Sequence, residues 1–322
     1  MKAIVFEKTG GPEVLKYIDA PKPELKPGTA IVKVHAAGVN FADTFFIRGE
    51  YMLKPKLPDT PGMEAAGVVE EVAPDVKDLK PGMRVTSITM KTYAEYCVVR
   101  PSQVIALPDY VSFEDGVAFP IQTLTAWHML HTAHRTKPGQ VVLVHSAAGG
   151  VGIVAIQIAK AAGARVIGTV SSESKAKLVK EWGADEVINY ATQDFAAETL
   201  KLTNGRGADL ILDAVGKPTF EKGLTCLAPF GHQILYGRAG GPPDSMNPFV
   251  LFNKSIKVSG FALPTVYGMP DVMREGIEKS FALIRDGKLK MFIGRKFPLA
   301  QAAEAHRFIA SRESVGKLVL TP

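Results

Sequence analysis

The chain has 322 residues, of which 46% are hydrophobic and 22% charged, and this composition excludes extended disorder. Because a single hydrophobic core stops growing at roughly 250 to 300 residues, we expect two globular domains. The formal net charge of +6 comes from lysines and arginines that are scattered along the chain, so it serves mainly solubility.

Targeting and cysteine signals favour a reducing compartment. The N-terminus runs from Met1 to Phe6 and then meets Glu7 and Lys8, so its apolar run is too short for a signal peptide. No uninterrupted apolar stretch reaches the roughly 18 residues of a membrane span, so we expect a cytoplasmic protein without a membrane partner. Cys97 and Cys226 are the only cysteines, which excludes a disulfide framework and a four-cysteine zinc lobe.

The first part of the chain, from Lys2 to about Pro120, predicts a mostly β domain. Short β segments such as Ala30 to Ala37 and Gly67 to Val72 are broken by Gly and Pro, and helical periodicity is scarce. From about Thr125, strand-like and helix-like segments alternate at the spacing of parallel βαβ units.

This second part predicts an α/β fold with a doubly wound parallel sheet. The candidate strands span Val141 to His145, Arg165 to Val170, Glu186 to Asn189, Ala208 to Asp213, Gly231 to Tyr236 and Ile256 to Phe261, the strand number of a complete dinucleotide-binding sheet. The helices between them span Val151 to Ala162, Ser174 to Trp182, Asp194 to Leu202 and Thr219 to Leu227. Two further helical stretches, Asp271 to Arg285 and Gln301 to Arg312, precede a last strand, Lys317 to Leu320, and we expect this tail to fold back onto the first domain.

A glycine-rich turn joins the first of these strands to an apolar helix. In the segment Ser146 to Gly152, Gly149 and Gly152 match the second and third glycines of a GxGxxG motif, and Ala147 stands in the first place. Backbone N–H groups and the positive end of a helix hold a dinucleotide pyrophosphate, so this turn must lack side chains where the phosphates approach. The strand before it and the helix after it favour a dinucleotide site over a glycine turn that binds nothing.

The end of the second strand favours NADP(H) over NAD(H). NAD-selective folds place an acid there, roughly 20 residues past the glycines, whereas this strand ends in Ser171 and Ser172 with Lys175 one turn later. Small hydroxyls and a cation suit the extra phosphate of NADP. Glu173 lies close and weakens the argument, and Lys175 has the alternative of a solvated lysine on a charged helix.

With these residues the chain resembles the medium-chain dehydrogenase/reductase superfamily and, within it, the zinc-free quinone oxidoreductases related to zeta-crystallin. The matching segments are Ala36 to Asp43, Pro61 to Gly67, Tyr93 to Tyr96, Leu124 to Trp127 and Val144 to Gly152. The resemblance implies a Rossmann domain, residues 124–261, inserted in a mostly β GroES-like catalytic domain, residues 1–123 and 262–322. It also implies an active site in the cleft between the two domains.

The resemblance also bears on zinc. Zinc-dependent alcohol dehydrogenases of this superfamily carry Cys where Asn40 stands and His where Met63 stands, and zinc prefers such ligands. Glu64 remains but cannot hold a metal alone. No metal site is therefore expected. Without a metal to polarise an alcohol oxygen, we expect reduction of a conjugated acceptor rather than alcohol oxidation.

The site residues that the resemblance implies fall into two groups. Asn40, Asp43 and Tyr51 line the substrate side, with Tyr51 placed near the nicotinamide or as a proton donor; Asp43 has the alternative of tying down a helix N-terminus and Tyr51 that of a core aromatic. The cofactor side comprises Thr125, Ala148, Gly149, Gly150, Val151, Ser171, Lys175, Tyr190, Tyr236, Gly237, Arg238, Ala239, Phe261, Leu263 and, at the 2′-phosphate, Arg312.

The leading prediction is an NADPH-dependent reductase of quinones or other α,β-unsaturated carbonyl compounds. An enoyl-thioester reductase of the same superfamily and a non-enzymatic NADPH-sensing or RNA-binding protein are the alternatives; no aromatic and arginine stacking motif supports nucleic acid binding. A homodimer is expected from the family, through the edge strand Ile256 to Phe261. His128, His131 and His134 recur every three residues, and we expect exposed helix-end histidines rather than a metal site. We expect His145 to pack under the glycine turn.

Overall fold

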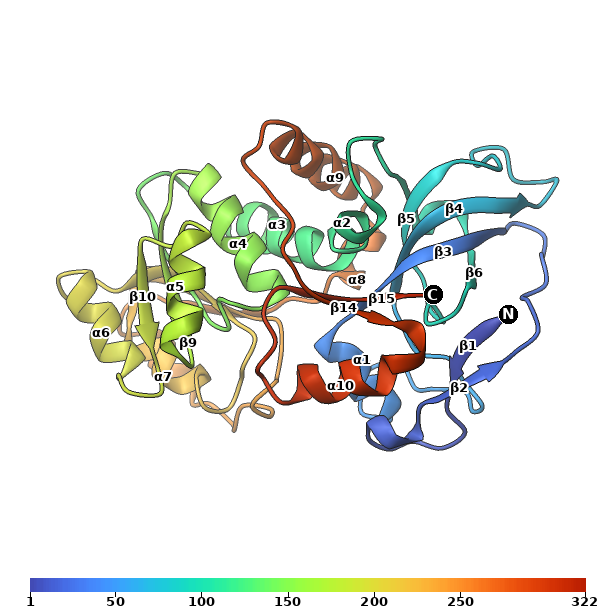
Figure 1. The fold of residues 1–322 in the computed structure, drawn as a ribbon. Helices are drawn as coiled ribbons and strands as arrows, with labels where there is room; N and C mark the ends of the chain where they lie inside the picture. The colour runs from blue at the N-terminus through green and yellow to red at the C-terminus, as the bar shows by residue number, and fades with distance from the viewer. The chain divides into compact units, whose positions relative to one another are not determined.

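The computed structural model describes residues 1–322, which form two compact units (Figure 1). The first unit comprises residues 1–121 and 291–322, and the second comprises residues 122–290. The second unit is thus inserted between the two chain segments that make the first. No helix has the length and apolar character that crossing a membrane requires.

The first unit is built on a seven-stranded sheet in the order β14-β15-β3-β4-β5-β7, with β6 paired to β3. The strands are β3 (Ala30–Val39), β4 (Glu64–Val72), β5 (Arg84–Ile88), β6 (Tyr96–Val99), β7 (Val104–Ala106), β14 (Ile293–Pro298) and β15 (Lys317–Thr321). A separate antiparallel pair joins β1 (Lys2–Val5) to β2 (Lys16–Asp19). Because β15 pairs with both β3 and β14, the C-terminal strand completes a sheet that the N-terminal segment begins.

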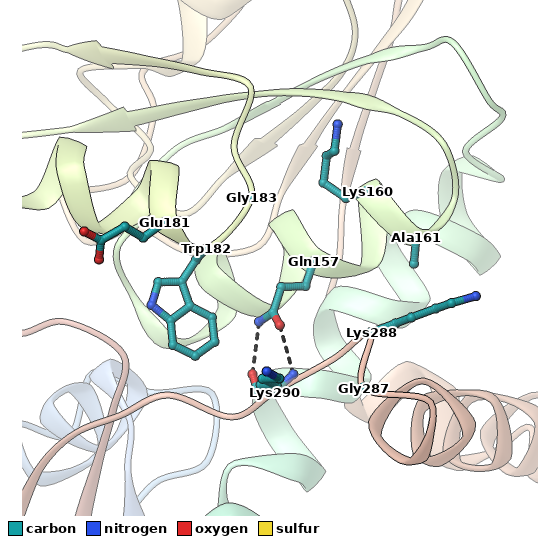
Figure 2. Close-up of a pocket in the computed structure, with 9 residues that line it drawn as sticks. All are labelled: Gln157, Lys160, Ala161, Glu181, Trp182, Gly183, Gly287, Lys288 and Lys290. Carbon is teal, nitrogen blue, oxygen red and sulfur yellow. Dashed lines mark hydrogen bonds between the residues drawn. The ribbon is translucent and has the colours of Figure 1, made fainter.

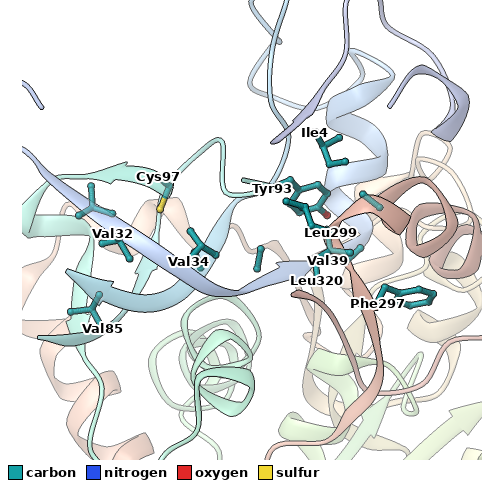
Figure 3. Close-up of a cluster of buried hydrophobic side chains, with 14 of the residues drawn as sticks. Ile4, Val32, Val34, Val39, Val85, Tyr93, Cys97, Phe297, Leu299 and Leu320 are labelled. Atoms are coloured by element: carbon teal, nitrogen blue, oxygen red, sulfur yellow. The ribbon is translucent and has the colours of Figure 1, made fainter. Parts of the chain in front are cut away.

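The core of this unit lies against the long central strand β3. Figure 3 shows Val32, Val34 and Val39 of this strand beside Tyr93, Cys97 and Leu320. The cluster also takes in Phe297 and Leu299 from the C-terminal segment. The two segments of the first unit therefore share one hydrophobic core, which ties the ends of the chain together.

Three helices accompany this sheet. They are α1 (Phe41–Ile47), α2 (Phe113–Val117) and α10 (Ala302–Ala310), with short 3₁₀ turns at Pro12–Val14, Pro101–Gln103 and Leu299–Gln301. The helix α1 begins directly after β3, with Asn40 as its N-terminal cap. The helix α10 contacts both α1 and β15, so the C-terminal segment lies against the start of the site described below.

The second unit is a parallel six-stranded sheet in the order β10-β9-β8-β11-β12-β13. The strands are β8 (Val141–Val144), β9 (Arg165–Val170), β10 (Glu186–Asn189), β11 (Ala208–Asp213), β12 (Leu227–Leu235) and β13 (Lys257–Gly260). The first strand in sequence is central, and the chain order runs outward from it in both directions, which is the doubly wound arrangement. The predicted fold class is confirmed.

Helices connect these strands as the βαβ pattern predicts. They are α4 (Gly150–Ala161), α5 (Glu173–Glu181), α6 (Phe195–Leu202) and α7 (Phe220–Thr225). Before β8 lie α3 (Leu124–Trp127) and two π-helical segments, Phe119–Thr123 and His128–His134. After β13 come α8 (Pro264–Tyr267) and α9 (Pro270–Arg285). A 3₁₀ turn at Pro248–Leu251 precedes β13.

The three closely spaced histidines correct one expectation. His128 is fully buried, and His131 and His134 are half-buried, because the segment is π-helical and packed rather than an exposed helix end. Burial lowers the pKa of His128 to about 4. His145 is buried, its ring meets Phe195 edge-on, and its Nδ1 lies 2.9 Å from the Thr169 hydroxyl.

Candidate active site

The glycine turn lies between β8 and the N-terminus of α4, where the strand order of the sheet reverses. Ser146 has the left-handed φ of 52°, and Gly149, with φ −76° and ψ 170°, is the N-cap of α4. No side chain caps this helix. The first N–H groups of α4 therefore remain available to an anion, which is the arrangement that binds phosphate at helix N-termini.

The glycines of this turn are needed for two different reasons. A Cβ on Gly152 would lie 2.7 Å from the carbonyl oxygen of Ala147 and would also overlap that of Ser146, so the backbone can approach the helix only without a side chain. A Cβ on Gly149 would meet only the Ser146 oxygen, at 3.2 Å, and otherwise open space. Gly152 thus serves the turn itself, and Gly149 leaves room beside the free N–H groups.

Gln122 adds a polar group to the turn that the sequence does not predict. Its side chain is buried and lies so close to Gly150 that a Cβ there would overlap its amide. Gly150 therefore provides the space that Gln122 occupies. The sequence contains no signal for this contact, because Gln122 lies in the π-helical segment Phe119–Thr123 and is separated from β8 by α3, a second π-helical segment and a loop.

The tip of β9 presents hydroxyls and a lysine beside the turn. Ser172 caps α5 by accepting a hydrogen bond from the N–H of Lys175 at 3.3 Å. Glu173 does not project freely toward this tip, since its carboxylate accepts a 2.7 Å hydrogen bond from the side chain of Asn189. Tyr190 follows β10 with its N–H bonded to the oxygen of Val170 at 3.0 Å and its side chain 48% exposed.

The remaining cofactor-side positions follow the other strands at the same edge of the sheet. Tyr236 to Ala239 come after β12, where the N–H of Ala239 bonds to the oxygen of Ala214 at 3.1 Å. Phe261 and Leu263 follow β13. Thr125 lies on α3, which packs against α4. The structure thus gathers the predicted positions of the second unit at the carboxyl ends of the strands and on α3, where open α/β sheets bind ligands.

Asp213, at the end of β11, organises this edge and was not predicted as a site residue. It is fully buried and accepts hydrogen bonds from the N–H of Val215 at 2.8 Å, the hydroxyl of Thr219 at 2.8 Å and the amide of Gln233 at 3.0 Å. An acid at the end of a strand is a visible sequence signal. Its partners are all internal, however, so Asp213 shapes the loop after β11.

In the first unit, Asn40 and Asp43 meet at the start of α1. The N–H of Asn40 donates to Asp43 Oδ2 at 2.7 Å, and the Tyr93 hydroxyl donates to the same oxygen at 3.1 Å. His306 Nε2 lies 3.2 Å from that hydroxyl. Asp43 Oδ1 is buried without a partner. Burial raises the pKa of Asp43 to about 7, against the effect of the hydrogen bond from Asn40, so this carboxyl changes its charge near neutral pH.

Asn40 is also part of a second, fully buried cluster. Its Nδ2 donates to Glu64 Oε1 at 2.6 Å, and its Oδ1 accepts from Lys317 Nζ at 2.9 Å. Lys317 forms an ion pair with the same oxygen of Glu64, and both side chains have 0% exposure. Both polar ends of the Asn40 amide are therefore engaged within the protein.

Tyr51 and Arg312 are the other predicted site residues of the first unit. Tyr51 is half-buried and packs against the cluster that contains Phe46 and Met63. Burial raises the pKa of Tyr51, and the negative charge of Asp43 adds to this. Arg312 is exposed, has a left-handed φ of 63° and follows α10.

A shallow pocket also lies on the second unit, along the C-terminal half of α4 (Figure 2). Its lining residues are Gln157, Lys160, Ala161, Glu181, Trp182, Gly183, Gly287, Lys288 and Lys290. The Gln157 side chain holds Lys290 by two backbone hydrogen bonds, of 3.0 Å and 2.9 Å. None of the predicted site residues lines this pocket, and it lies at the opposite end of α4 from the glycine turn.

Comparison with known proteins places both units in described families. Residues 26–109 match the alcohol dehydrogenase GroES-like domain, and residues 150–279 match the family described as zinc-binding dehydrogenase. The chain is 38% identical to the quinone oxidoreductase of Pseudomonas aeruginosa over 324 residues, which cover 100% of this chain and 99% of that protein. It is 34% identical to the 2-haloacrylate reductase of a Burkholderia species over 330 residues, 99% of this chain and 98% of that protein.

The structure agrees with these sequence matches. The quinone oxidoreductase of Escherichia coli, solved in complex with NADPH, superposes with a TM-score of 0.95 and 34% identity, covering 100% of both chains. Identity at this level over whole chains, with the same fold, means that the relationship extends to both units. The chain belongs to the quinone oxidoreductases of the medium-chain dehydrogenase/reductase superfamily.

Proposed function

We propose that this protein is an NADPH-dependent reductase that transfers a hydride to quinones or other α,β-unsaturated carbonyl compounds without zinc. The observation that carries the proposal is the edge of the second sheet, where an uncapped helix N-terminus and the Ser171, Ser172 and Lys175 group lie at neighbouring strand ends. A quinone oxidoreductase of the same fold binds NADPH, which supports the same cofactor here.

The residues of the second unit fit a dinucleotide phosphate. The space beside Gly149 and the unpartnered N–H groups of α4 would hold the pyrophosphate, and Lys175 with the serine hydroxyls would hold the 2′-phosphate. Glu173 is paired with Asn189, so it opposes that phosphate less than its position in the sequence indicates. When bound, NADPH supplies the hydride; the chain contributes binding and orientation.

In the first unit, Asn40, Asp43 and Tyr51 are the proposed acceptor-side residues. The Asn40 amide is bound at both ends, so we assign it to positioning. Asp43, with a pKa raised to about 7 by burial, can exchange a proton at neutral pH. The Tyr51 hydroxyl is the proposed donor to the acceptor oxygen, because the negative charge on a reduced quinone or enone develops there.

The residues around Glu64 do not fit a zinc ion, although the family of residues 150–279 is described as zinc-binding. Zinc requires thiolate, imidazole or carboxylate ligands, and the chain contains no group of three or more such side chains that could hold a metal. The neighbours of Glu64 are an amide and an ammonium group, from Asn40 and Lys317. The proposed reaction therefore includes no step at a metal.

The test is the oxidation of NADPH followed by absorbance with a panel of quinones, enones, 2-haloacrylates and enoyl-CoA esters. We expect turnover with a quinone or an enone, a preference for NADPH over NADH, and no change after treatment with a chelator. Turnover confined to enoyl-CoA esters would replace the proposal by an enoyl-thioester reductase. Tight NADPH binding without turnover of any acceptor would favour a sensing role.

We further propose that the protein forms a homodimer through β13. This strand is the edge of the six-stranded sheet, and unpaired edge strands are the usual places where two chains extend one sheet. Phe249, Phe252 and Phe230 are 75%, 80% and 72% exposed. Phe249 and Phe252 come shortly before β13 in the chain, and the N–H of Phe230 bonds to the oxygen of Lys254, which also precedes β13. These three aromatic residues are therefore close to the edge strand.

A further inference from the structure

The first unit contains a buried ion pair between Lys317 and Glu64. Both side chains have 0% exposure, although charged side chains leave water only when they gain compensating contacts. Lys317 begins β15, the C-terminal strand, and Glu64 begins β4. The fold therefore brings two charges from distant parts of the chain to one buried point.

The surroundings of Glu64 are built to hold its carboxylate. Oε1 accepts from Asn40 Nδ2 at 2.6 Å and from Lys317, and Oε2 accepts from the N–H of Ile121 at 3.1 Å. A Cβ on Gly38 would overlap this carboxylate, so β3 carries no side chain where Glu64 lies. All three groups are hydrogen-bond donors, so the site fits a carboxylate, which only accepts.

Through Asn40 the ion pair reaches the start of α1. Lys317 and Glu64 engage the two ends of the Asn40 amide, and the N–H of Asn40 donates to Asp43 at 2.7 Å. Both charges also act on Asp43 directly: the positive charge of Lys317 lowers the pKa of Asp43, and the negative charge of Glu64 raises it.

The other groups around Asp43 are mostly neutral. Tyr93 donates a hydrogen bond to it, and burial raises the pKa of Tyr93 well above its usual value. His306, on α10, contacts Tyr93, and burial lowers its pKa to about 4. The charge of Asp43 raises the pKa of Tyr51. Arg48, at the C-terminal end of α1, lowers the pKa of His306. Lys317 and Glu64 are thus the two groups of opposite charge that act on this carboxyl.

We propose that Lys317 and Glu64 are positioning residues of the acceptor site, which fix Asn40 at the start of α1 and set the electrostatic environment of Asp43. The buried cation beside Glu64 is then an ammonium group supplied by the last strand of the chain. The inference rests on the proposed function, because Asn40 and Asp43 are assigned there to the acceptor side.

The test compares three variants, Lys317→Met, Glu64→Gln and the double variant, by two readouts. The first is the pKa of Asp43, measured from the ¹³C carboxyl shifts of aspartate-labelled protein and assigned with Asp43→Asn. The second is the pH profile of kcat/KM for NADPH-dependent quinone reduction. We expect Lys317→Met to raise the Asp43 pKa and Glu64→Gln to lower it, each by about 1 unit, with the pH profile moving in the same directions.

A merely structural role predicts a different pattern, in which both single variants lose activity without opposite shifts in pH dependence. Shifts in the same direction, or no shift, would overturn the inference. Lys296→Met, which breaks the exposed ion pair with Glu114, is the matched control and is expected to leave the Asp43 pKa unchanged.

The double variant and the titration without substrate test the ion pair even if a single variant does not fold or the protein reduces no quinone. If a single variant does not fold, the double variant, which buries neither charge, is expected to show a raised Asp43 pKa, because Lys317 exerts the larger of the two opposing effects; an unchanged value would overturn the inference. The carboxyl titration needs no substrate. A wild-type protein that reduces no quinone therefore contradicts the proposed function alone, and the titration still decides the role of the ion pair.

Discussion

Lys175 stands at the third position of α5, the helix that follows β9, and its N–H is bonded to Ser172. We predict that Lys175→Glu weakens NADPH binding about 100-fold and NADH binding by less than about threefold, because a carboxylate would repel a 2′-phosphate that only NADPH carries. The measurement is the dissociation constant of each dinucleotide, from fluorescence titration at one ionic strength.

The matched control is Lys177→Glu, which makes the same charge change on an exposed residue of the same helix. It is expected to weaken both dinucleotides only slightly. Equal losses of NADPH and NADH in Lys175→Glu would remove the assignment of this lysine to the 2′-phosphate.

Local sequence patterns predict the glycine turn of the candidate site but not the buried polar side chains near Asp43. Gly149 and Gly152 were predictable because their role depends on having no side chain in a local motif. Lys317 was assigned only to a strand, since nothing in a lysine that precedes an apolar run indicates that it is buried. Its partners Asn40 and Glu64 lie 277 and 253 residues away, and a contact over that separation leaves no local pattern.

The glycine turn before α4 needs close backbone packing at Gly152 and open space at Gly149, and substitutions can separate these two requirements. A side chain on Gly152 would collide with the backbone of Ala147, whereas one on Gly149 would meet mainly open space. We predict that Gly152→Ala lowers the free energy of unfolding by about 2 to 3 kcal/mol, as overpacking against rigid backbone does. Gly149→Ala is expected to leave stability within about 0.5 kcal/mol and to weaken NADPH binding.

Urea denaturation and NADPH titration of the two variants test this division. Gly149 has a φ of −76°, which alanine adopts without strain, so it serves as the matched control for the loss of a glycine. A Gly149→Ala protein with normal stability and unchanged NADPH affinity would show that the open space beside Gly149 is not where the cofactor lies.

The elements of the second unit were predictable because their patterns are strong. The candidate strands at 165–170, 186–189 and 208–213 have the observed bounds, and α4, α5 and α6 begin and end within one residue of the prediction. Short buried strands alternating with capped helices carry clear signals. The strand β12 begins at Leu227, earlier than predicted. Its first part did not read as a strand because it contains Pro229 and Phe230, which has a φ of 62°.

Among the segments that the sequence did not predict, β14 and residues 119–134 have physical reasons for it. The strand β14 reads Ile-Gly-Arg-Lys-Phe-Pro and is largely exposed, so it has no apolar alternation to reveal it. Residues 119–134 form π-helical and α-helical turns in succession. The hydrogen-bond pattern of a π-helix is rare and shifts the period of the buried positions, which is why His128 was expected at the surface.

At the scale of the whole molecule, the order of the chain makes the first unit depend on its last residues. The strand β15 completes the sheet with β3 and β14 and brings Lys317 to Asn40 and Glu64. The core shown in Figure 3 likewise joins β3 to Phe297 and Leu299. Closure of the first unit therefore requires contacts of large sequence separation, whereas the second unit can form from consecutive βαβ units.

The exposed aromatic segment before β13 carries the last prediction, which concerns assembly. If β13 pairs with its copy in a second chain, Phe249 and Phe252, which are 75% and 80% exposed and stacked on each other, are covered in the dimer but not in the single chain.

We predict that the wild-type protein elutes at twice its mass of 34.6 kDa and that Phe249→Asp/Phe252→Asp elutes as a monomer with an unchanged melting temperature. Light scattering after size exclusion, at several concentrations, gives the masses. Tyr110→Asp, which places a charge on an exposed aromatic side chain of the first unit (58% exposed), should leave the dimer intact. A wild-type protein that is monomeric at every concentration measured would exclude β13 as an assembly surface.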